Sequence, residues 1–194
     1  MATDARPTAM RALEYLQELA LEKGLDDVSM RDVAKRLGIS LAALQYHYPN
    51  KAALLDAFVS QTVEGYRRRI ETILATSPEG ERFANLVRFA ATETVQTDRH
   101  GVLAMIEGRA SHDDAARHAI GLFLASYLTA MRDALIADVP DMPPAKALLK
   151  VSLVVSMLEG LPSLIEPACD LGLDGETLVD SAVQTATALA LWTP

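Results

Sequence analysis

The stretch that decides the fold is VSMRDVAKRLGISLAALQYHYPNK, residues 28–51. Its first part has the pattern of a helix start. Ser29 is a residue type that caps helices, and Asp32 stands three positions later, where its carboxylate can bond back to the cap in a capping box. Apolar residues then recur at helical spacing as far as Leu37. This pattern predicts a well-specified helix over residues 30–37.

A second helix start follows almost at once. Ser40 is another helix-capping residue, and Ile39 before it is placed to contact Leu44 after it as a hydrophobic staple. Gly38 lets the backbone turn where a side chain would obstruct it. We therefore expect a second short helix over residues 41–48. Two short helices joined by a tight glycine turn are typical of a helix-turn-helix motif.

The second of these helices has an unusual outer face. At 100° per residue, a helix that turns Leu44 inward also turns Tyr48 inward. The outward side then carries Ala42, Ala43, Gln45 and Tyr46. Alanine methyl groups allow close approach to base edges, and the Gln45 amide can bond to N6 and N7 of adenine together. Such a face suits the major groove of DNA.

Charge is distributed unevenly along the chain. The net charge is −8, yet residues 1–51 carry seven basic and seven acidic side chains, so the whole excess of acid falls in residues 52–194. Residues 28–51 hold four bases and one acid. Lys51 stands at the start of the next predicted helix, capped by Asn50, where a bound phosphate would offset the unfavourable helix dipole. We expect a local basic face of this kind to meet a polyanion.

The rest of the chain has helical period throughout, and no run alternates apolar and polar residues for long enough to form a strand. We therefore predict an all-α protein of about nine helices. Beyond the two short helices, the expected helices cover residues 7–23, 50 to the mid 70s, 79–97, 101–111, 113–138, 145–169 and 174–192. The length favours a small domain in residues 1–51 and a larger helical domain in residues 52–194, linked by the helix from Asn50.

The sequence carries no pattern typical of a disulfide-bonded, membrane-spanning, metal-binding or enzymatic protein. The lone Cys169 cannot form an internal disulfide, which fits a reducing cytoplasm. We expect no signal sequence, and the apolar region 151–165 is too short and too interrupted to cross a bilayer. The acids and histidines around residues 112–118 do not share one helical face, so no metal site is predicted. Phosphate-binding glycine loops, nucleophile elbows and zinc-protease motifs are missing, so we predict no enzyme, no catalytic residue and no cofactor.

The residues VSMRDVAKRLGISLAALQYHYPNKAALL, 28–55, closely resemble the DNA-binding segment of the tetracycline-repressor (TetR) family of bacterial regulators. The shared features are the capping serine, Ala34, Leu37, Gly38, Ser40, Leu44, the aromatic-His-aromatic run and Lys51. The resemblance implies a three-helix DNA-binding head and a helical body that holds a small-molecule pocket. It also implies a homodimer formed through the last two helices, about 145–169 and 174–192, in a bacterial cytoplasmic protein associated with the nucleoid.

The function that the resemblance implies is a transcriptional regulator, most simply a repressor. It would bind a palindromic operator in double-stranded DNA and be released by a small-molecule effector. The positions that match the family's DNA-facing residues are Ser29, Arg31, Ser40, Leu41, Ala42, Ala43, Gln45, Tyr46, His47 and Lys51. Many members carry a tyrosine that contacts phosphate where this chain has Gln45, so base reading and backbone contact are both open for Gln45.

The pocket in the body is likewise implied by the resemblance, and the sequence offers side chains that could line it. Large, adaptable apolar groups and a few polar ones occur at helical spacing beyond residue 99. The candidate ligand-binding residues are His100, Met105, Arg109, Phe123, Tyr127, Met131, Met157 and Glu159. Core packing is the alternative role for each of them.

Two other functions compete with the regulator. A helical small-molecule-binding dimer that has lost DNA binding would be expected to carry acids or bulky groups on the face at 40–47, where none is found. An all-α enzyme would require titratable residues clustered in one pocket, whereas the histidines of the body are scattered along the sequence.

Overall fold

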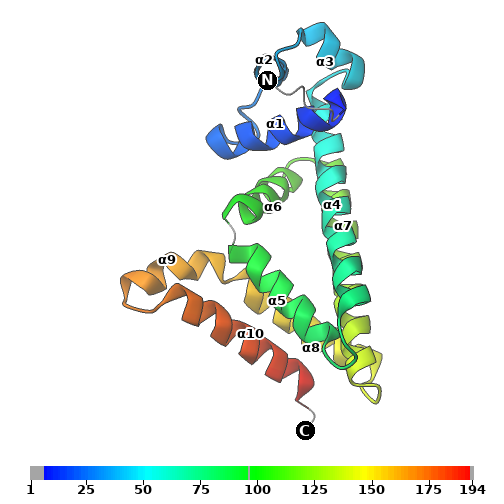
Figure 1. The fold of residues 1–194 in the computed structure, drawn as a ribbon, viewed down its shortest axis with the longest axis vertical. Helices are drawn as coiled ribbons and strands as arrows, with labels where there is room; N and C mark the ends of the chain where they lie inside the picture. Colours follow the sequence, from blue (N-terminus) through cyan, green and yellow to red (C-terminus); the bar gives the residue numbers. More distant parts are fainter. Residues whose placement is uncertain (1–6, 96, 193–194) are drawn as a thin grey trace. The chain divides into compact units, whose positions relative to one another are not determined.

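The computed structural model describes residues 7–95 and 97–192, and all its regular structure in these ranges is helical (Figure 1). The all-α prediction is therefore confirmed. The described helices are α1 (Thr8–Lys23), α2 (Met30–Leu37), α3 (Leu41–His47), α4 (Lys51–Thr76), α5 (Arg82–Val95), α6 (Thr97–Ala110), α7 (Asp114–Asp138), α8 (Pro144–Glu159), α9 (Pro162–Asp170) and α10 (Gly175–Leu191).

One predicted helix is wrong. The single helix expected over 145–169 is broken into α8 and α9, which meet at a bend of 49°. Pro162 is the first residue of α9. Proline is tolerated at this position because the first helical N–H has no partner in the helix, whereas in a helix interior its ring clashes with the carbonyl four residues earlier. The described residues therefore form ten helices where about nine were predicted.

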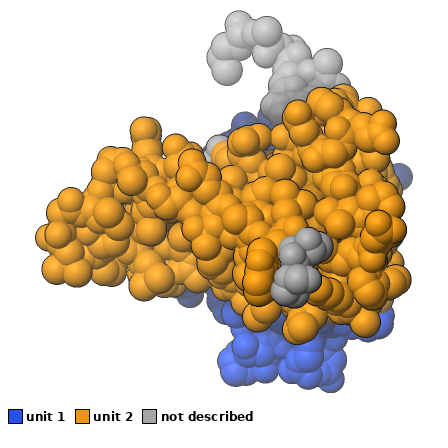
Figure 2. Space-filling model, turned by 90° about the horizontal axis from the view of Figure 1, so that it is seen from below, with its two compact units in different colours: residues 1–64, 101–120 blue, residues 65–100, 121–194 orange. Residues whose placement is uncertain are grey.

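The chain divides by packing into two compact units, drawn in different colours in Figure 2. The first unit comprises residues 1–64 and 101–120, and the second comprises residues 65–100 and 121–194. Both α4 and α7 run through this division, so each of these long helices contributes one part to each unit.

Within the first unit, α1, α2 and α3 contact one another around a small apolar core. Its fully buried side chains include Leu16, Val28, Val33, Leu44 and Leu54. They come from α1, the turn before α2, and α2 to α4, so each short helix supplies at least one anchor. Helices as short as α2 and α3 are marginal alone in water, and their stability depends on this packing.

In the second unit, α5, α8 and α10 contact one another (Figure 1), and α7 adds further side chains to the same core. Residues 116–138 of α7 are apolar and long enough to cross a bilayer by length and composition alone. However, Tyr127, Met131 and Leu135 of this stretch are buried in the core of the second unit. Core helices of globular proteins share that composition, and burial accounts for it here.

Lys150 on α8 is a buried charge with a defined role in this core. Its ammonium donates hydrogen bonds to the carbonyl oxygens of Leu189 at 2.7 Å and Ala190 at 3.0 Å, and also to the carbonyl of Trp192. These carbonyls belong to the C-terminal end of α10, where the helix dipole favours a cation. Lys150 therefore joins α8 to the end of α10.

We predict that Lys150→Met lowers the free energy of unfolding by about 1–3 kcal/mol, because it leaves the last carbonyls of α10 without their donor. Urea denaturation followed by circular dichroism measures the change. Lys146→Met, one turn earlier on α8, is the control and should change the free energy by less than about 0.5 kcal/mol. Equal effects of the two substitutions would contradict the bonding role of Lys150.

Candidate nucleic-acid interface

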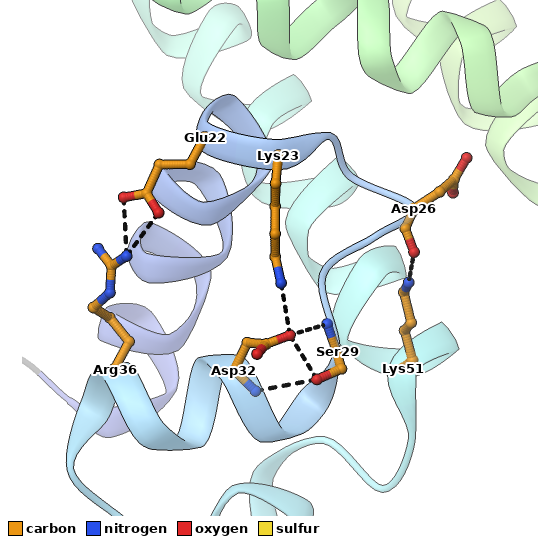
Figure 3. A network of polar contacts seen from close by, with 7 residues as sticks. All are labelled: Glu22, Lys23, Asp26, Ser29, Asp32, Arg36 and Lys51. Atoms are coloured by element: carbon orange, nitrogen blue, oxygen red, sulfur yellow. Dashed lines mark hydrogen bonds and ion pairs between the residues drawn. The ribbon is translucent and has the colours of Figure 1, made fainter.

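The start of α2 is built as a capping box (Figure 3). The Ser29 hydroxyl oxygen accepts from the Asp32 backbone N–H at 3.2 Å, and the Ser29 backbone N–H donates to the Asp32 carboxylate at 2.8 Å. The same carboxylate oxygen accepts from the Ser29 hydroxyl at 2.6 Å and from Lys23 of α1 at 2.9 Å. The hydrogen bond from the Ser29 hydroxyl, followed by that from Lys23, holds the pKa of Asp32 far below its usual range. The predicted capping box is therefore confirmed.

The turn between α2 and α3 depends on Gly38, whose φ of 72° and ψ of 29° lie in the left-handed region. Its N–H donates to the carbonyl of Lys35 at 3.1 Å, while the N–H of Ile39 donates to the carbonyl of Ala34 at 3.0 Å. This pair of bonds is a Schellman motif, which ends α2 and redirects the chain. The predicted glycine turn is confirmed, and it sets the angle at which α3 leaves α2.

Both ends of α3 are fixed as the sequence predicts. Ser40 caps the start, with its hydroxyl oxygen accepting from the Ala43 N–H at 3.1 Å. The backbone of Tyr48, immediately before Pro49, is extended and ends the helix. Asn50 then caps α4, because its side-chain oxygen accepts from the Ala53 N–H at 2.9 Å.

The faces of α3 also agree with the sequence pattern. Leu44 is fully buried, and Tyr48 is half-buried with its hydroxyl donating to the Ala9 carbonyl at 3.0 Å. Burial raises the pKa of that phenol. Of the residues predicted to face DNA, Leu41 is half-buried, and the exposed ones on α3 are Ala42, Ala43, Gln45, Tyr46 and His47. Tyr46 is 86% exposed, with its ring packed edge-on against His47 at 5.4 Å.

The basic side chains near this face fall into two groups. Arg31 and Lys35 extend from α2 with exposed side chains. Arg36 is directed back to α1, where it pairs with Glu22 at 2.8 Å and Glu18 at 3.3 Å. The ammonium of Lys51 donates to the backbone carbonyl of Asp26 at 2.5 Å (Figure 3).

This arrangement can accept a double helix. A seven-residue helix with methyl groups and one amide on its outer side fits the width of a major groove, which is about 12 Å. Residues 33–50 carry no carboxylate to repel phosphates. The hydroxyls of Ser29 and Ser40 and the cations of Arg31 and Lys51 border the face, and groups of these types make most protein contacts to DNA phosphates.

Only some of the candidate ligand-binding residues lie in the same unit. In the second unit the rings of Phe123 and Tyr127 stack at 6.1 Å. Burial, with a smaller contribution from Glu159, raises the pKa of Tyr127 strongly. Met131 and Met157 belong to or pack against the core of the same unit.

The other candidates lie elsewhere. Met105 and Arg109 are in the first unit, and the Arg109 guanidinium binds the Asp113 carboxylate at 2.5 Å. The side chain of His100 lies outside the described residues. Within the described residues, no group of three or more His, Cys, Asp or Glu side chains is placed to hold a metal ion.

Two residues near these sites were missed by the sequence reasoning. Tyr66 on α4 joins the aromatic cluster, with its ring 5.5 Å from that of Phe123. Its helical spacing from other apolar residues of α4 predicts burial, but it does not show which ring it meets. Asp26 was missed because it holds Lys51 through a backbone carbonyl, and every residue has one.

Comparison with known proteins finds sequence similarity in the N-terminal part of the chain. The family model of the tetR family of bacterial regulatory proteins matches residues 15–58. Over 64 residues, the chain is 36% identical to the HTH-type transcriptional regulator UidR of Escherichia coli strain K12. That alignment covers 33% of this chain and 33% of UidR, so the chain matches about a third of the length of this relative.

Two solved structures share the fold over nearly the whole chain. A transcriptional regulator from Saccharomonospora viridis in complex with choline is 20% identical, with a TM-score of 0.76, over 92% of this chain and 93% of that one. AibR in complex with isovaleryl coenzyme A and operator DNA is 18% identical, with a TM-score of 0.70, over 92% and 97%. The predicted TetR resemblance is confirmed for residues 15–58, and the relative matched there is a transcriptional regulator.

The capping box gives a prediction for acid stability. The pKa of Asp32 is lowered on folding, so its carboxylate stabilises the fold above its unfolded pKa of about 4, and this contribution is lost as the pH falls below that value. Between pH 5 and pH 3, the thermal midpoint of Asp32→Asn should therefore fall less than that of the unsubstituted protein. Asp27→Asn, an exposed acid in the preceding turn, is the control. The assignment is wrong if both variants lose the same amount of pH dependence.

Proposed function

We propose that this chain is a transcriptional regulator of the TetR family of bacterial regulatory proteins, and that it represses by binding a palindromic operator as a homodimer. A small-molecule effector would release it from the DNA. The observation that carries the proposal is the outer face of α3, which is exposed, free of carboxylates and built from small or hydrogen-bonding side chains.

In the proposed complex, α3 enters the major groove. Ala42 and Ala43 approach the base edges closely, and Gln45 either reads a base or bonds to the backbone. The remaining contacts border the groove and position the head on phosphates and sugars. These contacts come from Ser29, Arg31, Ser40, Leu41, Tyr46, His47 and Lys51, and ionic ones among them make binding dependent on salt.

Residues 1–51 form the DNA-binding domain in this proposal, and residues 52–194 form the regulatory and dimerisation domain. This division by function differs from the division by packing, because α4 is one continuous helix that passes from the head into the body. Such a regulator acts in the bacterial cytoplasm on the DNA of the nucleoid.

The proposed dimer forms through the last helices, α8 to α10. Large apolar side chains are exposed there, although most such side chains are buried elsewhere in the second unit. The exposed set on α8 and at the end of α10 is Leu148, Leu149, Leu153, Leu189, Leu191 and Trp192. Exposed apolar groups gathered in this way mark surfaces that another protein covers. A two-fold dimer would place the two α3 helices in major grooves about 34–36 Å apart, or a multiple of that distance.

The proposed effector binds in the body near Phe123 and Tyr127, whose aromatic rings stack, and Glu159 is the proposed polar contact. The two structural neighbours bind choline and isovaleryl coenzyme A, so the shared fold accommodates ligands of different chemistry. An effector releases DNA only to the extent that it binds the DNA-free conformation more tightly than the DNA-bound one.

The test of the DNA-binding face begins with selection by the purified protein from random-sequence duplexes, which should enrich a palindrome. On that duplex, Ala42→Glu should weaken binding by about 100-fold or more, because it places a carboxylate against phosphates. The helical circular dichroism should stay unchanged. Ala137→Glu, at an exposed alanine of α7, is the control and should bind like the unsubstituted protein. Tight binding by Ala42→Glu would mean that α3 does not enter the groove.

The test of the dimer uses two leucines of equal exposure. Leu149 on α8 is 62% exposed and Leu122 on α7 is 60% exposed. Leu149→Glu should raise the dissociation constant of the dimer by about 100-fold or more, since each two-fold interface loses the contact twice and gains two unpaired charges. Analytical ultracentrifugation measures the change. Leu122→Glu should leave the dimer intact, and dissociation by both variants alike would argue against the proposed interface.

A further inference from the structure

Lys51 is fixed by a contact that the sequence does not reveal. Its ammonium donates to the backbone carbonyl of Asp26 in the turn between α1 and α2, and the side chain is half-buried there (Figure 3). An ammonium has three N–H groups, so one can stay on this carbonyl while the others meet phosphate oxygens. The position of the Asp26 carbonyl therefore determines where the charge of Lys51 is presented.

Asp26 itself faces in two directions. Its carbonyl points to Lys51, whereas its carboxylate extends to the other side of the turn in Figure 3 and is 87% exposed. The carboxylate lies 4.0 Å from the guanidinium of Arg109 near the end of α6. One residue thus contacts both the predicted phosphate-binding lysine and a helix that follows the DNA-binding domain in the sequence.

Arg109 also forms an ion pair with a second carboxylate. Its side chain is only 20% exposed, and the guanidinium binds the Asp113 carboxylate at 2.5 Å. Asp113 in turn caps α7, since its second oxygen accepts from the Ala116 N–H at 3.1 Å. The planar, multi-donor guanidinium can serve two carboxylates at once, and here it joins the α6–α7 turn to Asp26.

The turn that carries Asp26 has few regular hydrogen bonds of its own. Residues 24–29 lie outside any helix, and the turn is anchored in the head by the buried side chains of Leu25 and Val28. The exposed Asp26 lies between these anchors. A shift of Arg109, or loss of its charge, acts on Asp26 and so on the acceptor of Lys51. Without Arg109, the Asp26 carboxylate would also be an uncompensated negative charge close to bound DNA.

We propose that Arg109 and Asp26 are positioning residues for DNA binding: Arg109 on α6 neutralises and locates Asp26, whose carbonyl presents the Lys51 ammonium to the phosphate backbone. This inference rests on the proposed function, and it links the α6–α7 turn to the phosphate contact proposed for Lys51. The route consists of one ion pair and one hydrogen bond, both within the first unit.

The test is a double-mutant cycle measured by fluorescence anisotropy on the duplex that the unsubstituted protein selects. Arg109→Gln should weaken binding about two- to fivefold, the range expected for an ion pair with one exposed partner. In an Asp26→Asn background, Arg109→Gln should have no further effect. In an Asp27→Asn background, which changes the net charge equally one residue along, the full weakening should persist. The proposal is overturned if Arg109→Gln has the same effect in both backgrounds or none in the unsubstituted protein.

A second measurement needs no DNA. Amide hydrogen exchange of residues 24–29, followed by mass spectrometry, should be faster in Arg109→Gln than in the unsubstituted protein, because the turn loses an outside contact. Unchanged exchange there would overturn the proposed positioning even if DNA binding fell. If the unsubstituted protein selects no duplex, the proposed function fails instead, and the exchange measurement still decides whether Arg109 holds the turn.

Discussion

The burial of Leu44 is the contact on which the rest of the proposed interface depends. A helix of seven residues cannot persist in water by its own hydrogen bonds, so α3 takes its stability from the head core and its orientation from the one side chain that is fully buried there. With Leu44 fixed, helical geometry turns Ala42 and Tyr46 to the opposite side. The Ser40 cap fixes the start of α3, and the extended backbone of Tyr48 before Pro49 ends the helix.

Two cations of the head, Lys23 and Arg36, form ion pairs with carboxylates of neighbouring helices. Acids of α1 hold Arg36, and Lys23 of α1 bonds to the Asp32 carboxylate of the capping box. These pairs join α1 to α2, whereas α3 carries no acidic residue. The whole net negative charge of the chain lies in residues 52–194, so in the proposed complex the attraction to phosphates comes from residues 1–51.

Local sequence patterns predict the ends of helices well where a residue type strongly favours one local structure. The serine caps, the left-handed Gly38 and the break before Pro49 all have the structure that their local chemistry favours. The same reasoning failed at 145–169, because the apolar composition continues on both sides of the break and the prediction did not treat Gly160 and Pro162 as a helix end. Sequence reasoning also did not predict the ion pair of Arg109 with Asp113, since a long polar side chain at helical spacing has no local signal for the partner it meets.

What the sequence by itself determined is therefore most of the helices, the caps of α2 and α3 and the outward face of α3, because hydrogen bonds and periodicity within a few residues specify these. Only the tertiary structure decided that Lys150 is buried at the end of α10, that Tyr66 joins the rings of α7, and that Lys51 bonds to Asp26. Each of these contacts joins residues more than twenty positions apart through a flexible side chain. Packing of the whole unit selects one of the many positions that such a side chain can reach.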